Sequence, residues 1–387
     1  MFSERTRWER SANRLARLLD AKRAAGAPIL DLTEANPTRA GLAYPDDLLE
    51  PLADPGGLVY EPAAPGLAAA RAAVAGDYAR RGLALDPDRL ILTASSSEAY
   101  ALLLKLLCDP GDAVLVPRPS YPLLEYLARL ESVAVAHYPL RYDGVWQTDL
   151  TDLAAAITPR TRAVMVVHPN NPTGSFLKRH GAQALMALCA ERGLALVADE
   201  VFADYAFSAD PRRAGSFAGD APALAFALGG LSKSCGLPQL KLGWIAVSGP
   251  EALRDEALAR LEIAADTYLS VGTPVQRAAP ALLHRKGELQ AAIMERLRGN
   301  LATLRARVAG SPATLLAAEG GWYGVLRIPA TLGEEERVLR LLEARDVLVH
   351  PGYFFDFESE AFLVISLLPP PDTFAEGVAR VLADLVI

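Results

Sequence analysis

Apolar residues along this chain form short runs that alternate with longer stretches of helical spacing. Strand-like runs occupy residues 90–93, 113–116, 133–136, 163–167, 195–198, 223–227 and 243–247, and helix-like stretches occupy 66–81, 96–108, 122–131, 179–192 and 251–263. Alternation of strands and helices is typical of a parallel sheet covered on both faces. The pattern therefore predicts an α/β fold whose large domain is a mostly parallel seven-stranded sheet sandwiched by helices.

The pattern changes after residue 275. A long helical region, 275–308, precedes a strand at 322–328, a helix at 333–345, strands at 346–350 and 361–367, and a helix at 372–386. These elements predict a smaller α+β domain that the N-terminus completes. We expect an N-terminal arm and part of the small domain in 1–50, the large domain in 51–280 and the C-terminal small domain in 281–387.

The N-terminal residues show helical spacing of their own. In 3–20, Trp8, Ala12, Leu15 and Leu19 fall on one helical face, opposite Arg and Glu residues. This predicts an amphipathic helix that either rests on its own domain or contacts a partner.

Composition narrows the class of protein. The chain has 387 residues, of which 51% are hydrophobic, and a net charge of −7. No basic block stands out, so we expect neither nucleic acid nor membrane as a partner. The first residues are charged and lack the apolar segment of a signal peptide, and a cytoplasmic location is expected. Cys108, Cys189 and Cys235 are scattered, which favours neither a disulfide framework nor a metal site.

Lys233 is the first candidate for chemistry. It follows the strand-like run 223–227 and lies among small residues, where a lysine can reach into a cleft. Desolvation lowers the pKa of a lysine and favours the neutral amine that attacks an aldehyde. Lys241 supplies a second positive charge eight residues later. Taken alone, each lysine is better explained as an ordinary surface residue.

Two polar residues follow other predicted strands. Asp199 ends the run 195–198, and the carboxyl ends of parallel strands are where α/β sheets build their sites. A buried aspartate there could pair with a protonated ring nitrogen, although Asp is also a common helix cap. Asn171 lies in a Pro- and Gly-containing turn after 163–167, where its amide could donate to a ligand.

Two further segments could bind an anion and an aromatic ring. Ser95, Ser96 and Ser97 precede the helix 96–108, and hydroxyls with free N–H groups at a helix start bind phosphate well. A capping box with Glu98 explains the same serines. Tyr121 could stack on a flat heterocycle or simply pack in the core.

Together these segments resemble the class I/II aminotransferases of the fold type I enzymes that use pyridoxal 5′-phosphate (PLP), over roughly residues 30–380. The resemblance implies the following roles: Lys233 forms the Schiff base, Asp199 binds the pyridine nitrogen, Asn171 the phenolic oxygen, Tyr121 the ring face, and Ser95, Ser96, Ser97 and Lys241 the phosphate. Tyr60 matches a tyrosine that reaches the partner subunit's phosphate, which implies an obligate homodimer with shared active sites.

The chain departs from the family pattern at three positions. Phe202 stands where the family usually has a tyrosine that donates to the phenolic oxygen, and Gly230 replaces a common Ser or Thr. Val364 stands where an arginine usually binds the substrate carboxylate. Arg39 is our first candidate for that role, near Asn36, with Tyr353 as a further substrate-binding candidate; Lys178, Arg118 and Arg327 are weaker candidates.

The resemblance implies a transaminase that moves an amino group from an amino acid to a 2-oxo acid by a ping-pong mechanism. Another PLP reaction on the same fold, such as a β-lyase, decarboxylase or elimination reaction, stays open because of Val364. A ligand-sensing protein with an aminotransferase-like body is a further alternative, but no helix-turn-helix pattern accompanies it here.

Overall fold

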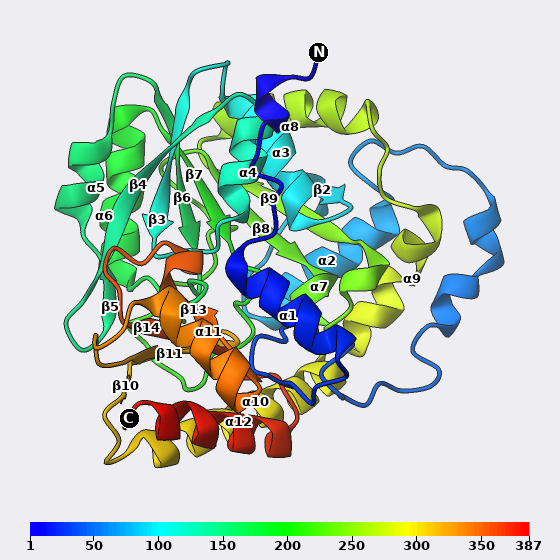
Figure 1. Ribbon diagram of the computed structural model, residues 1–387. Coiled ribbons are helices and arrows are strands. Elements are labelled where there is room, and N and C mark those ends of the chain that lie inside the picture. The colour runs from blue at the N-terminus through cyan, green and yellow to red at the C-terminus, as the bar shows by residue number, and fades with distance from the viewer. Residues whose placement is uncertain (387) are drawn as a thin grey trace.

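The core of the molecule is an eight-stranded sheet (Figure 1). Our computed structural model describes residues 1–386. Across the sheet, the order is β2 (Leu90–Thr93), β9 (Gly243–Ser248), β8 (Ala225–Gly230), β7 (Ala195–Asp199), β6 (Thr161–Val167), β3 (Ala113–Arg118), β4 (Ala134–Tyr142) and β5 (Trp146–Thr148). Of these strands, β9 and β5 run opposite to the other six. The predicted mostly parallel sheet is therefore confirmed, and the short strand β5 adds an eighth strand at its edge.

Helices cover both faces of this sheet, because alternate strand residues point to opposite sides. On one face, residues such as Met165 and Phe226 pack in one buried cluster with helices α3 (Ser96–Leu107), α4 (Leu123–Leu130) and α8 (Glu251–Asp266). On the other, residues such as Leu115 and Leu196 pack with α2 (Ala68–Arg80), α5 (Leu150–Ala156), α6 (Arg179–Arg192) and α9 (Thr273–His284).

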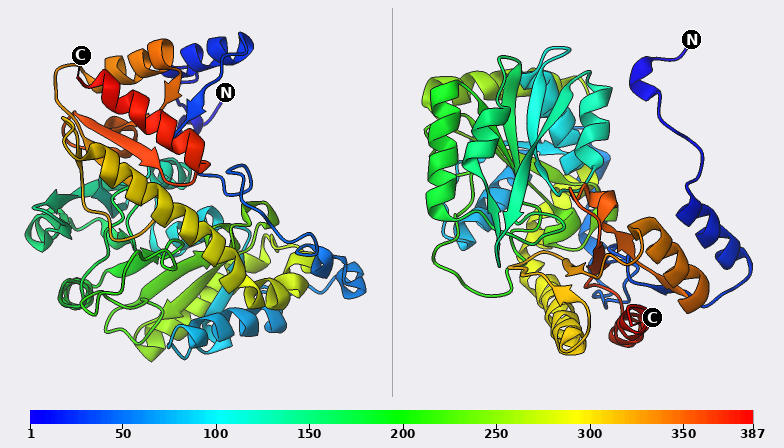
Figure 2. Two further views of the ribbon diagram at one scale, coloured as in Figure 1. Left: turned by 90° about the horizontal axis from the view of Figure 1, so that it is seen from below. Right: turned by 60° about the vertical axis from the view of Figure 1, so that its left-hand side comes forward.

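A smaller domain joins the two ends of the chain (Figure 2). Its antiparallel sheet has the order β10 (Thr314–Leu315), β11 (Tyr323–Arg327), β14 (Phe362–Ser366) and β13 (His350–Pro351). Strand β1 (Leu30–Asp31) pairs with β12 (Val347–Leu348), so the N-terminal segment lies against this part of the chain. Helices α10 (Lys286–Val308), α11 (Glu334–Arg345) and α12 (Pro371–Asp384) pack around it. The predicted helix 275–308 is thus two helices, which are separated at Arg285.

The prediction of one helix over 3–20 is wrong. After the short 3₁₀ helix η1 (Glu4–Thr6), helix α1 spans Arg14–Ala24, because Asn13 caps it by accepting a hydrogen bond from the N–H of Ala16 at 2.8 Å. Trp8 instead packs on Tyr126 of α4, with the ring centres 5.6 Å apart. Trp8 and Leu15 therefore make two separate contacts: Trp8 packs on α4, and Leu15 packs in the core of the smaller domain.

Short helices lie in the loops around the large sheet. They are η2 (Glu50–Ala53), η3 (Pro55–Leu58), η4 (Pro87–Arg89), α7 (Leu231–Ser234), η5 (Pro238–Leu240) and η6 (Gly352–Phe355). The segment with η2 and η3 projects from the body at the right of Figure 1. Across residues 1–386, no helix has the length and apolar character that crossing a bilayer requires.

Candidate active site

Lys233 lies in α7, directly after β8. Its Nζ atom is 4.7 Å from the ring centre of Trp322 and 5.4 Å from that of Phe202. Nζ forms no hydrogen bond or ion pair within the described part of the chain, whereas the backbone carbonyl of Lys233 accepts a hydrogen bond from the Tyr205 hydroxyl at 2.6 Å. Burial lowers the pKa of Lys233 to about 8, although the negative charge of Asp199 opposes this shift. The side chain is therefore a buried amine that is readily deprotonated and has no protein acceptor.

Asp199 ends β7, which pairs with β8 on one side and β6 on the other. Its Oδ2 accepts a hydrogen bond from the hydroxyl of Tyr100 at 3.0 Å, and its Oδ1 accepts one from the N–H of Val201 at 3.1 Å. Burial raises the pKa of Asp199, whereas both donors and the nearby Lys233 lower it. No helix follows at 201–204, so Asp199 is not a helix cap. Its carboxylate therefore lies at the carboxyl end of β7, beside the end of β8 that leads to Lys233.

Asn171 lies in the loop after β6, beside the end of β7. The side-chain oxygen of Asn170 accepts two bonds from Thr173, at 3.3 and 2.9 Å, which shapes the turn. In contrast, Oδ1 of Asn171 is buried and has no hydrogen-bond partner among residues 1–386. Such an amide is costly unless a ligand satisfies it.

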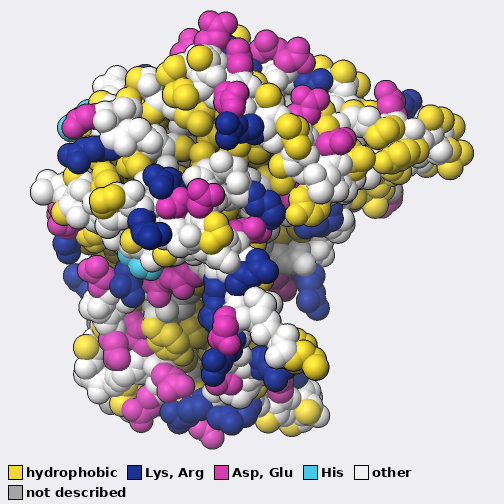
Figure 3. All heavy atoms as spheres, turned by 90° about the horizontal axis from the view of Figure 1, so that it is seen from above, with side chains coloured by type: hydrophobic (Ala, Val, Ile, Leu, Met, Phe, Trp, Pro, Cys, Tyr) yellow, Lys and Arg dark blue, Asp and Glu magenta, His cyan; other side chains and the backbone are white. Residues whose placement is uncertain are grey.

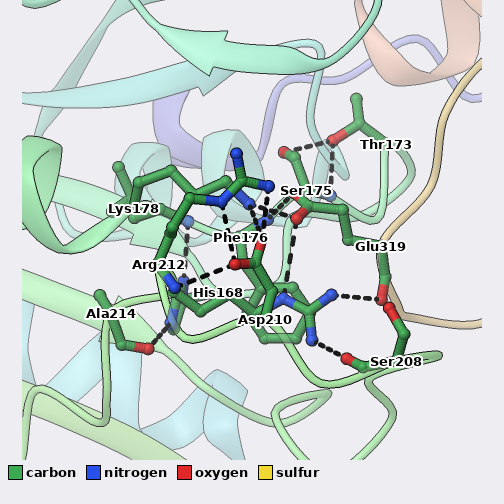
Figure 4. Close-up of polar contacts among 12 residues, drawn as sticks. His168, Thr173, Ser175, Phe176, Lys178, Ser208, Asp210, Arg212, Ala214 and Glu319 are labelled. Carbon is green, nitrogen blue, oxygen red and sulfur yellow. Dashed lines mark hydrogen bonds and ion pairs between the residues drawn. The ribbon is translucent and has the colours of Figure 1, made fainter.

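An ion cluster ties this loop to the small domain (Figure 4). Lys178 binds Glu319 and lies 3.5 Å from Asp210, and Glu319 also accepts a hydrogen bond from the N–H of Phe176. The Arg212 guanidinium holds the pKa of Asp210 well below its usual range. Glu319 lies three residues before Trp322, so the cluster helps to place the Trp322 ring beside Lys233. Because Lys178 is already paired, it is a poor candidate for binding a substrate carboxylate.

Gly174 shows how closely these two segments pack. Its φ is 69°, and a Cβ atom there would lie 2.3 Å from the carbonyl oxygen of Gly320. That carbon could not be accommodated, and the left-handed backbone favours glycine as well. The glycine at the end of this loop is therefore required by packing against the segment that carries Trp322.

The three serines lie at the N-terminus of α3. Ser95 caps the helix by accepting a bond from the N–H of Glu98, and Glu98 accepts one from the N–H of Ala94. The capping alternative is therefore realised for Ser95. The hydroxyls of Ser96 and Ser97 form no hydrogen bond within the described residues, so they and the first N–H groups remain available to an anion.

The other cofactor-binding candidates are exposed in a single chain. Tyr121 is 51% exposed, and its ring centre lies 6.3 Å from that of Phe355. Lys241 is exposed and has a φ of 52°. Tyr60 is 73% exposed on the projecting segment. Of these three, Tyr121 thus forms an aromatic pair with Phe355, which lies in η6 next to strand β13 of the smaller sheet.

The substrate-binding candidates are spread more widely. Oδ1 of Asn36 accepts bonds from the N–H and hydroxyl of Thr38, so it serves a local turn. Arg39 follows that turn, is exposed and forms no ion pair with residues 1–386. The N–H of Tyr353 donates to Glu334 on α11. Its neighbour Phe355 is the aromatic ring that lies beside Tyr121.

Val364 is fully buried in β14, between Val325 and His350. Arg118 donates to the carbonyl of Asp356 at 3.0 Å and lies 3.9 Å from its carboxylate. Arg327 is exposed at the end of β11. Neither Arg118 nor Arg327 therefore takes the place that an arginine at position 364 of β14 would occupy.

Gly230 is explained by a close backbone approach. The N–H of Leu231 donates to the carbonyl of Leu242 at 2.9 Å, which draws the two strands' ends together. A Cβ atom at position 230 would lie 3.1 Å from that carbonyl oxygen and 3.2 Å from Cα of Gly243. A side chain at position 230 would therefore crowd the backbone at the start of β9.

Sequence reasoning missed Tyr100, Trp322 and Glu200. Tyr100 lies four residues after Ser96, and that helical spacing could have placed both on one face of α3. Glu200 is buried beside Asp199 and accepts bonds from the Ser216 hydroxyl and the N–H of Phe217, both at 2.6 Å. Burial raises the pKa of Glu200 to about 7. No sequence signal distinguishes Trp322 from an ordinary core residue.

The residues around Lys233 fit pyridoxal 5′-phosphate. Lys233 offers an amine without an acceptor, Asp199 a carboxylate for the ring nitrogen, and Asn171 an amide whose buried oxygen, an acceptor, has no partner among the described residues. The free hydroxyls and N–H groups at the start of α3 complement a phosphate. The amine of Lys233, the carboxylate of Asp199 and the start of α3 thus match the aldehyde, the ring nitrogen and the phosphate of the cofactor, and the amide nitrogen of Asn171 is the group that could donate to its phenolic oxygen.

Known proteins show the same architecture. The family "Aminotransferase class I and II" matches residues 30–381. Nicotianamine aminotransferase 1 of Oryza sativa is 31% identical over 234 residues, which are 59% of this chain and 46% of that protein. Alanine aminotransferase of Mycobacterium tuberculosis is 28% identical over 368 residues, 92% of this chain and 85% of that protein. The structure of alanine aminotransferase from Pyrococcus furiosus aligns with a TM-score of 0.91 over 100% of both chains at 25% identity.

Members of this family use pyridoxal 5′-phosphate. This is the group that the residues around Lys233 suit. With the family match spanning nearly the whole sequence and the same fold present throughout, this chain belongs to the class I and II aminotransferases.

Proposed function

We propose that this chain is a PLP-dependent aminotransferase that moves an amino group from an amino acid to a 2-oxo acid through a Schiff base on Lys233. The observation that carries the proposal is the buried Lys233 amine, which has no protein acceptor and shares a sheet edge with Asp199. Two relatives are named alanine aminotransferases, so alanine and its 2-oxo acid, pyruvate, are the first pair to test.

Lys233 is the group that moves protons. When bound, the cofactor supplies an electron-poor ring that accepts the electron pair of a substrate bond. Lys233 Nζ takes the proton from the substrate α-carbon, and its pKa of about 8 suits both uptake and release near neutral pH. The rings of Trp322 and Phe202 cover the amine and exclude water from it.

The remaining residues bind and orient. Asp199 holds a proton on the ring nitrogen, and Asn171 donates to the phenolic oxygen. Tyr121 covers the ring face. The start of α3, with Ser96 and Ser97, binds the phosphate together with Lys241.

Arg39 is our proposal for the cation that binds the substrate carboxylate, with Asn36 and Tyr353 as further contacts. Position 364 holds a buried valine, and both Lys178 and Arg118 are already paired with carboxylates. Arg39, by comparison, is exposed and unpaired within residues 1–386. It follows the turn at Asn36, next to Pro37, which packs near Gly236 just beyond Lys233.

The relatives do not favour a lyase, decarboxylase or elimination reaction, since the proteins named above are aminotransferases. A half-reaction separates these classes. Alanine alone should convert the absorption of the loaded protein to that of the pyridoxamine form and release one equivalent of pyruvate. Continuous release of CO₂ from alanine without a 2-oxo acid would instead indicate a decarboxylase, and continuous release of pyruvate from a β-substituted donor such as cysteine would indicate a lyase.

A donor–acceptor screen tests the assignment of Lys233. Lys233→Ala should abolish turnover for every pair, because no other base replaces Nζ. Lys105→Ala is the matched control, since Lys105 is paired with Glu131 on the surface and should retain full activity. Wild-type protein that loads the cofactor but transaminates no amino donor would contradict the proposal.

We also propose a homodimer with shared sites. Leu58, Val59 and Tyr60 are 90%, 65% and 73% exposed, which is unusual for adjacent large apolar residues. The projection at the right of Figure 3 shows hydrophobic side chains over much of its surface. Burying it against a second copy would bring Tyr60 toward the partner's phosphate site.

Subunit mixing tests this arrangement. Lys233→Ala and Tyr60→Ala variants, each inactive or weak alone, should regain about a quarter of wild-type activity when refolded together, because half of the dimers then hold one intact site. A monomer in analytical ultracentrifugation, or mixtures without recovery, would contradict a shared site.

A further inference from the structure

Tyr100 connects the core of α3 to the carboxylate of Asp199. The residue is 7% exposed and packs in the cluster between α3 and the sheet. Its hydroxyl reaches the edge of the sheet and donates to Asp199 Oδ2 at 3.0 Å. Among the described residues, the Tyr100 hydroxyl has no other hydrogen-bond partner. The single proton of this hydroxyl is therefore committed to Asp199.

The two oxygens of Asp199 are held from different directions. The N–H of Val201 fixes Oδ1 from the loop after β7, and Tyr100 fixes Oδ2 from α3. Two donors restrict rotation of the carboxylate and favour its charged form, which burial alone would disfavour. Tyr100 itself stays protonated, because burial and the adjacent negative charge raise its pKa well above the usual value.

We propose that Tyr100 is a positioning residue, which orients the carboxylate of Asp199 and keeps it ionised so that it holds a proton on the ring nitrogen of the cofactor. This inference rests on the proposed function. Without the hydroxyl, Asp199 would keep one donor, and the proton between carboxylate and ring nitrogen would move toward the carboxylate.

Tyr138 provides a control for the simpler role of filling the core. It is 1% exposed, and its hydroxyl donates to the carbonyl of Met165 at 2.8 Å. Its replacement by phenylalanine removes a buried hydroxyl of the same kind without touching Asp199. A merely structural contribution of Tyr100 would therefore be reproduced by Tyr138→Phe.

The experiment follows the ring nitrogen directly. Wild type, Tyr100→Phe and Tyr138→Phe are loaded with ¹⁵N-labelled pyridoxal 5′-phosphate, and the nitrogen chemical shift is recorded at neutral pH. The dissociation constant is measured for this cofactor and for its 1-deaza analogue, in which carbon replaces the ring nitrogen. We expect Tyr100→Phe to move the nitrogen signal toward the unprotonated form and to weaken binding of the natural cofactor about tenfold, in line with the loss of one charge-assisted hydrogen bond. Its affinity for the deaza analogue should equal that of wild type.

Two results would overturn the inference. One is a nitrogen signal in Tyr100→Phe that matches wild type, and the other is an equal loss of affinity for the natural cofactor and the deaza analogue. If the nitrogen signal of Tyr100→Phe shifts no more than that of Tyr138→Phe, it counts as matching wild type. Failure of the proposed function looks different, since the wild-type protein would then bind neither form of the cofactor, or would bind the natural cofactor and transaminate no amino donor.

Discussion

We expect the contribution of Glu200 to the stability of this protein to fall as the pH rises toward neutral. Its carboxyl is 5% exposed. Burial raises its pKa from 4.5 to about 7, although Ser216, Phe217 and Arg81 oppose the shift. Between these two values the folded chain keeps a proton that the unfolded chain releases. The contribution of Glu200 to the free energy of unfolding therefore decreases over this window: it is fully present below pH 4.5 and is lost above pH 7.

The size of the effect follows from the two pKa values. Their difference corresponds to about 3 kcal/mol of unfolding free energy. Glu200→Gln removes the titration but keeps an oxygen for the N–H of Phe217 and an amide for the Ser216 hydroxyl. The variant should match wild type near pH 4.5 and exceed its stability by up to about 3 kcal/mol at pH 8.

Urea unfolding of the cofactor-free protein between pH 4.5 and 8.5 measures this difference. Glu256→Gln is the control, because Glu256 lies on the exposed surface of α8 in an ion pair with Arg260. Its curve should run parallel to that of wild type. If Glu200→Gln also runs parallel to wild type, Glu200 does not take up a proton on folding and the reasoning fails.

Three further changes test the unusual positions of the site. Phe202→Tyr places a donor near Lys233 and should lower, by about one unit, the pH at which the absorption of the bound cofactor changes; an unchanged titration would show that the new hydroxyl does not reach the phenolic oxygen. Gly230→Ala should cost about 1–3 kcal/mol in urea unfolding, because the new Cβ meets backbone at 3.1 Å, whereas Gly181→Ala has open space and should not destabilise. Arg39→Ala should raise KM for the amino donor about tenfold or more with a smaller change in kcat, and an unchanged KM would exclude Arg39 as the carboxylate ligand.

The sequence by itself determined the layered α/β fold and the chain positions of its site. Continuous apolar runs separated by helical spacing leave few alternatives to a parallel sheet, and polar residues after those runs must meet at one edge. Lys233 and Asp199 are brought to that edge for this reason. The predicted start of the N-terminal helix was wrong because the side chain of Asn13 caps the helix, which begins at Arg14 although the apolar spacing extends further toward the N-terminus.

Only the tertiary structure decided how the site residues are held. Tyr100 reaches Asp199 across 99 positions of sequence, and Trp322 reaches Lys233 from the other domain. Such contacts depend on how helices and loops pack onto the sheet, which local spacing does not encode. The same holds for Lys233: its position followed from the pattern, whereas its lowered pKa follows from burial that only the folded chain creates.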